Sequence, residues 1–114
     1  MNAEIKSILG ENISNGNTSV PVAHLRYKGN SRSFVVWSIL SERPTLSADD
    51  EQIFSVVSVD IDVFSNGNYS KLITEIKRRM KENGWVWVED SVEMYEDDTG
   101  LYHKTITFEK ERSL

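Results

Sequence analysis

The run from Ile53 to Val63 constrains the fold more than any other stretch of this chain. Ile53, Val57, Val59, Ile61 and Val63 fall at odd-numbered positions, whereas Asp60 and Asp62 fall at even-numbered positions. Successive side chains of a β-strand point to opposite faces, so this pattern predicts a strand with one face in a core and a second face that turns polar towards its end. The chain is therefore expected to be built on a sheet.

Other segments predict the rest of that sheet. β-Branched and aromatic residues are typical of strands, and we expect strands at residues 33–40, 53–63, 85–90 and 101–109. Pro21 predicts an extended or edge segment over residues 22–27, because proline has no N–H for an inner ladder. The remaining polar segments are interpreted as loops, at residues 11–20, 41–50 and 93–100.

Two segments carry apolar residues at helical spacing. Residues 2–9 predict a short helix that Asn2 can cap and Gly10 can end. A longer helix is predicted to follow Asn68 and to run to about Glu82. Its single apolar stripe consists of Tyr69, Leu72, Ile73, Ile76 and Met80.

The order of these elements predicts one α+β domain over residues 1–114. Strands joined in pairs, with helices outside the pairs, favour an antiparallel sheet of about four strands with two helices packed on one face, in the order α-β-β-α-β-β. A chain of 114 residues is also of the size that forms a single core.

Composition excludes several classes of protein. The chain has no cysteine, so disulfides, thiolate catalysis and cysteine-type zinc sites are ruled out. No apolar run approaches the roughly 20 residues that span a bilayer, and the first residues lack a signal-peptide pattern, so synthesis in the cytoplasm and no contact with membranes are expected. Lys and Arg number 13 against 18 Asp and Glu, which disfavours general or sequence-specific binding of DNA.

No group of residues predicts catalysis, a cofactor or a metal site. His24 and His103 lie in separate extended segments, and the acidic clusters at residues 49–51 and 96–98 lack the spacing of a calcium loop. Phosphate-binding and serine-nucleophile motifs do not occur. The basic run from Lys77 to Lys81 is interpreted as solvated cations at a helix end rather than as a nucleic-acid contact. We therefore expect a protein that is not an enzyme.

Six residues are candidates for a protein interface. Trp85 and Trp87 share one strand face, where they either form core beneath a helix or anchor a protein partner. Phe54 and Val56 lie on the second face of the 53–63 strand and indicate either a second packed layer or a subunit interface. Asp49 and Asp50 lie in a polar loop that a neighbouring subunit could contact.

Two stretches carry a pattern of moderate specificity. The first is a strand that ends in Asp-x-Phe-Ser, within Val59 to Tyr69, and is preceded by the polar residues 47–51. The second is Tyr-Glu-x-Asp-Thr-x-x-Tyr-His-Lys, at residues 95–104, with Phe108 after it. Together they resemble the small tail-terminator and tail-completion (head–tail joining) proteins of long-tailed phages and prophages of Gram-positive bacteria.

This resemblance implies a virion structural protein without a catalytic component. It implies a subunit that is made in the bacterial host cytoplasm and forms a ring with itself, typically a hexamer, at the head-proximal end of the tail. The implied partners are the phage tail tube protein and head connector proteins. Two other functions stay open: a head–tail connector subunit of the neck, and a monomeric protein-binding adaptor that uses the Trp85 and Trp87 face.

Overall fold

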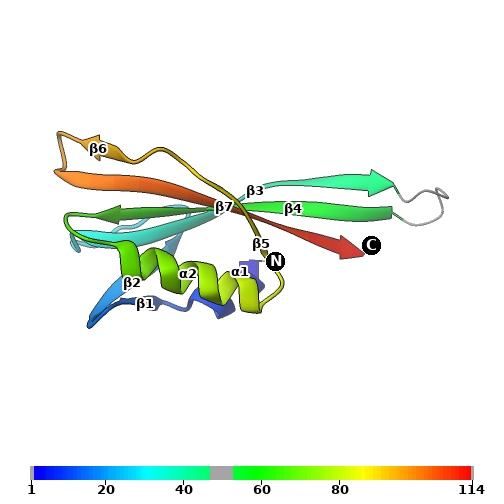
Figure 1. Cartoon of the computed structure of the whole chain (residues 1–114), viewed down its shortest axis with the longest axis horizontal. Helices are drawn as coiled ribbons and strands as arrows, with labels where there is room; N and C mark the ends of the chain where they lie inside the picture. The colour runs from blue at the N-terminus through cyan, green and yellow to red at the C-terminus, as the bar shows by residue number, and fades with distance from the viewer. Residues whose placement is uncertain (1, 47–52, 114) are drawn as a thin grey trace.

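A computed structural model describes residues 2–46 and 53–113 of the chain (Figure 1). Its elements in chain order are α1 (Asn2–Leu9), β1 (Asn12–Asn15), β2 (Thr18–His24), β3 (Ser33–Leu46), β4 (Ile53–Ser65), α2 (Ser70–Glu82), β5 (Val86–Asp90), β6 (Met94–Glu96) and β7 (Leu101–Ser113). Within these residues neither helix is long and apolar enough to cross a membrane.

The strands form one mixed sheet of seven strands, so the expected antiparallel sheet of about four strands is wrong. The strand order is β1-β2-β3-β4-β7-β5, and β6 pairs with β7 beside β5. β2 and β3 are parallel, with Val22 opposite Val35 and His24 opposite Trp37. All other neighbouring strands are antiparallel.

The additional strands lie largely in segments whose polar composition predicts loops. Residues 12–15 and 18–21 form a hairpin, because Gly16, with φ +66°, opens a two-residue turn between Asn15 and Thr18. β3 continues through the predicted loop to Leu46, because residues 41–46 pair with residues 53–58 in the first half of β4. β6 lies within the predicted acidic loop and pairs with the start of β7.

The sheet curls around α2 and does not present one flat face to two helices. The two strands that end the sheet, β1 and β5, both contact α2, and α1 packs against α2 (Figure 1). Asn15 of β1 links one sheet edge to the helix, because its Oδ1 accepts a hydrogen bond from the Leu72 N–H at 3.2 Å and its Nδ2 donates to the Asn68 carbonyl at 3.0 Å. The start of α2 is thus capped by a residue far away in the sequence.

The core fills the inside of the curl. Val57, Val59, Ile61 and Val63 are all buried there, which confirms the alternation in the central strand. The buried side chains of α2 pack against them and are Leu72, Ile76 and Met80. α2 begins at Ser70, close to its predicted start, and ends at Glu82 as predicted.

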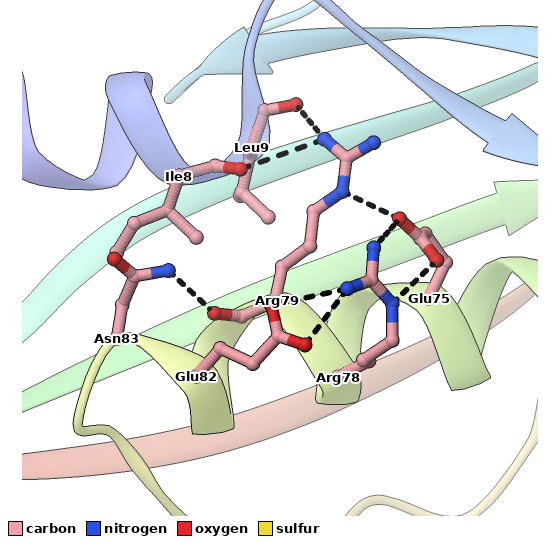
Figure 2. Close-up of polar contacts among 7 residues, drawn as sticks. All are labelled: Ile8, Leu9, Glu75, Arg78, Arg79, Glu82 and Asn83. Carbon is pink, nitrogen blue, oxygen red and sulfur yellow. Dashed lines mark hydrogen bonds and ion pairs between the residues drawn. The ribbon is translucent and has the colours of Figure 1, made fainter.

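Hydrogen bonds from Arg79 join the two helices, and ion pairs within α2 hold Arg78 and Arg79 of the 77–81 run (Figure 2). Arg79 donates to the carbonyls of Ile8 and Leu9 at the end of α1, at 3.5 and 3.2 Å, and its Nε donates to Glu75 at 2.7 Å. Arg78 binds Glu75 and Glu82. Hydrogen bonds from these two arginines hold the pKa of Glu75 at about 2.

The outer face of the sheet carries half-buried aromatic and polar side chains, with both helices on the other side (Figure 1). Four rings stack across it, from Tyr27 through Phe34 and Phe64 to His103, with neighbouring centroids 4.1 to 4.7 Å apart. Asp62 accepts one hydrogen bond from the Thr105 hydroxyl at 2.5 Å, and its carboxylate lies 3.1 Å from His103 Nε2.

Candidate assembly surface

One edge of the sheet exposes apolar side chains in an unusual concentration. We call residues 86–98 the β5–β6 flank; it comprises β5, β6 and the segments beside them, and it lies along the free side of β7. Its large exposed side chains are Val86, Trp87, Val88, Val92, Met94 and Tyr95. Monomeric proteins rarely expose contiguous apolar patches, and an exposed apolar strand at a sheet edge is a ready template for another chain.

The backbone of β5 is available for such a contact. β5 ends the strand order, so none of the strands in the described part of the chain pairs with its outer side. A bulge between Trp87 and Glu89 shifts its register against β7. Bulges twist an edge and re-aim side chains, which fits a surface that is shaped for a specific partner.

The same flank is strongly acidic. Between residues 86 and 98 the chain has no Lys or Arg, and its acids are Glu89, Asp90, Glu93, Glu96, Asp97 and Asp98. Burial pushes the pKa of Asp90 upward, but hydrogen bonds from Lys77 and Trp87 outweigh it, so the pKa lies below its ordinary value. Asp90 is therefore charged and tied to α2, whereas Glu89, Asp97 and Asp98 are exposed.

Two hollows separate the flank from α2. One has a volume of about 690 Å³, and Tyr69 and Glu93 lie on its wall, where the Tyr69 hydroxyl donates a hydrogen bond to the Glu93 carboxylate. Burial and the neighbouring Glu93 raise the pKa of Tyr69, so this hydroxyl stays protonated. The other hollow, of about 400 Å³, is lined by Lys77, Lys81, Trp85, Val86, Trp87 and Phe108. The exposed aromatic side chains and the methionine of the flank are of the types enriched at protein contacts.

The structure places the two predicted tryptophans in different environments, although both line the smaller hollow. Trp85 is only 2% exposed and belongs to the core, with its Nε1–H donating to Glu4 at 3.2 Å. Trp87 is 53% exposed; Lys77 lies 4.2 Å from its ring centre, and its Nε1–H donates to Asp90 at 2.8 Å. Of the pair, only Trp87 is open to a partner.

The other predicted interface residues lie away from this flank. Phe54 and Val56 are half-buried on the outer face of β4, opposite Thr45 and Arg43 of β3. Asp49 and Asp50 lie outside the described residues. The structure thus brings none of these four together with Trp87.

The histidines remain separate, as their segments implied. His24 stacks on Trp37 at 4.1 Å, whereas His103 lies between Asp62 and Glu96. Across residues 2–46 and 53–113, no group of three or more His, Asp or Glu side chains could hold a metal ion.

Sequence reasoning missed Val92, Met94 and Tyr95 as surface residues. They lie in or beside residues 93–100, whose acidic composition predicts a loop. The signal that could have identified them is the mixture of apolar and acidic residues from Val92 to Glu96. Val92, Met94 and Tyr95 add to the exposed apolar side chains of β5, and such a cluster, unlike a single exposed residue, indicates a contact.

Comparison with known proteins finds a similarity to solved structures. No protein-family model matches the chain, and no curated protein sequence does. Among solved structures, the chain is similar to one chain of a structure described as the virion of a native gene transfer agent (GTA) particle. The match covers 98% of this chain and 86% of that chain, with a TM-score of 0.55 and 10% sequence identity. The two chains therefore share a fold.

Proposed function

We propose that this chain is a non-catalytic structural subunit of a phage-like particle. The supporting observation is the shared fold, because it extends over 98% of the chain and the matching chain comes from a virion. A fold by itself does not determine function. The exposed β5–β6 flank adds a feature of this chain's own, since a subunit of an assembly needs apolar surface that its isolated form leaves open.

Within that class, we propose a tail terminator or tail-completion subunit. The two stretches that carry the sequence resemblance are neighbours in the sheet, since Phe64 is paired with His103 and Ser65 with Tyr102. The ring of Phe64 stacks on that of His103 at 4.1 Å. The pattern Asp-x-Phe-Ser and the pattern Tyr-His-Lys thus form one structural unit across β4 and β7, which supports treating them as a single signature.

The proposed partners follow from this assignment. Copies of the subunit would form a ring at the head-proximal end of the tail tube, in contact with the tube protein on one side and with head connector proteins on the other. The ring is the arrangement that closed head-to-tail contacts between identical subunits produce.

The test is to add the purified chain to tails from a phage that encodes it but has had the gene deleted, and to measure tail lengths by negative-stain electron microscopy. Tails of uniform length that join heads are expected. Thr74→Ala, an exposed change on α2, is the matched control and should terminate tails as the parent does. Unchanged, overlong tails would overturn the assignment, and joining of heads without control of length would favour a connector subunit of the neck.

A further inference from the structure

All the large exposed apolar side chains of the described residues fall into two groups, which belong to different strands of the sheet. Seven belong to or adjoin the β5–β6 flank, including Tyr102, whose ring meets that of Tyr95 edge-on at 5.1 Å. The other two are Leu25, 67% exposed, and Leu40, 60% exposed. They lie where the pairing of β2 with β3 ends, and we call residues 24–32 and 38–41 the β2–β3 flank.

The two flanks have opposite charge. From residue 12 to residue 41 the chain has no Asp or Glu, and its cations are Arg26, Lys28 and Arg32. All three are exposed, but the Arg32 guanidinium lies beside Gly100, just before β7, so the basic charge of this flank is carried by Arg26 and Lys28. Arg26 and Lys28 form no ion pair within the described part of the chain. The basic β2–β3 flank and the acidic β5–β6 flank are therefore complementary surfaces.

Leu25 carries a second sign of a functional surface. It has φ +68°, in the left-handed region that disfavours residues with a side chain, and it is the only non-glycine residue among those described with a positive φ. Its N–H donates to the Trp37 carbonyl at 2.9 Å, which holds the strained residue at the end of β2. A strained and exposed leucine contributes little to an isolated subunit, so it points to a partner that covers it.

Strand order determines what kind of contact these flanks can make. In the sheet, β3 and β5 are separated by β4 and β7, so β5 is not paired with β2 or β3 within one copy. Contact of the β5–β6 flank with itself in a second copy would place acidic residues against acidic residues. Contact of one flank with the other joins opposite charges and repeats head to tail, which produces a ring when the rotation closes.

We propose that the β5–β6 flank of one copy docks on the β2–β3 flank of the next copy. Met94 and Tyr95 meet Leu25 and Leu40 at its apolar centre, and Asp97 and Asp98 face Arg26 and Lys28. The contact rests on the proposed ring-forming function and identifies the surfaces that build the ring.

Disulfide trapping tests the contact directly, because the chain contains no cysteine. Leu25→Cys and Met94→Cys are made in separate chains that differ in mass through a tag, then mixed and oxidised at high concentration. A head-to-tail contact predicts mixed 25–94 disulfides in about tenfold excess over 25–25 and 94–94 disulfides. Thr74→Cys, at an exposed position of α2, is the control. It should form a disulfide with neither the Leu25→Cys chain nor the Met94→Cys chain.

A charge exchange sharpens the result. Arg26→Glu with Lys28→Glu in the Leu25→Cys chain should lower the yield of mixed disulfide about tenfold at low salt. Adding Asp97→Lys with Asp98→Lys to the Met94→Cys chain should restore it, because the complementary charges have then changed places. Failure of either the loss or the recovery would contradict the charge pairing.

The outcomes separate this contact from the proposed function. Predominant 94–94 disulfides, or no excess of mixed disulfides over the Thr74→Cys control, would overturn the contact even if the chain terminates tails. Mixed disulfides from a chain that leaves tails overlong would support the contact and overturn the tail-terminator assignment.

Discussion

The inside of the curled sheet and the β5–β6 flank contain the same kinds of side chain in opposite environments. Trp85 and Trp87 are two residues apart, yet Trp85 is 2% exposed and Trp87 is 53% exposed. Trp85 packs in the core, whereas Trp87 lies at the sheet edge with Lys77 above its ring. The comparison shows that the chain buries part of its apolar surface in the core and leaves another part exposed at the sheet edge.

The two regions differ in whether α2 packs against them. α2 fills the inside of the curl and contacts β5, whereas the chain after Asp90 runs away from α2 towards β6 (Figure 1). Substitutions inside the curl should therefore change folding, and substitutions on the flank should change association. Each prediction below tests one part of this division.

The largest effect is expected from Trp85→Ala. It should lower the free energy of unfolding by about 3 to 5 kcal/mol, because it leaves a cavity in the core. Trp87→Ala, the matched change on the flank, should cost about 1 kcal/mol or less, mainly through loss of the Lys77 contact. Urea denaturation of both variants and the parent measures the difference. Similar losses for the two would break the division between core and flank.

The next effect concerns how the sheet is held closed around α2. Asn15→Ala removes both hydrogen bonds from β1 to the start of α2 and should cost about 1 to 2 kcal/mol. Asn17→Ala, in the same hairpin but exposed, is the control and should change stability little. Thermal unfolding followed by circular dichroism compares them. If the two variants melt together, the link from Asn15 does not stabilise the curl.

A smaller effect depends on pH. The pKa of Glu75 is lowered from 4.5 to about 2, so its ion pairs stabilise the fold above pH 4.5 and this contribution is lost as pH falls towards 2. Glu75→Gln should cost about 1 kcal/mol at neutral pH, because water screens the half-exposed Arg78. The stability of the variant should also fall less between pH 4.5 and 2.

Melting temperatures of the Glu75 variant and the parent, measured from pH 7 to pH 2, check this prediction. Glu82→Gln is the control, since Glu82 binds Arg78 alone and is more exposed than Glu75. Parallel curves for Glu75→Gln and the parent would show that the Glu75 ion pairs do not stabilise the fold.

The smallest effect is expected to be stabilising. Leu25→Asn should raise the free energy of unfolding by about 0.5 to 1 kcal/mol, because asparagine tolerates the left-handed backbone better than leucine does. Leu40→Asn, an exposed leucine with an ordinary φ, should leave stability unchanged. Differential scanning calorimetry measures both. A lower melting temperature for Leu25→Asn would mean that Leu25 stabilises the isolated subunit and is not kept for a partner.

Local pattern was sufficient for several elements. The two helices and the strands at 33–40, 53–63 and 101–109 are present, within longer strands in each of the three cases. Periodicity is a property of neighbouring residues, so it predicts which face of Val57 to Val63 is buried without knowledge of the partner. Exposure at Trp87 could not be predicted in this way, because Trp85 and Trp87 have the same spacing pattern.

The sequence by itself determined the central apolar strand, the amphipathic helix and the absence of cysteine. Only the tertiary structure decided that residues 12–15, 41–46 and 94–96 are strands, because polar segments become strands when distant segments offer them hydrogen bonds. It also decided that the sheet curls around α2 and that two flanks of opposite charge lie on different strands of it. Those arrangements depend on strand order, which no local pattern contains, since it arises from contacts between residues far apart in the chain.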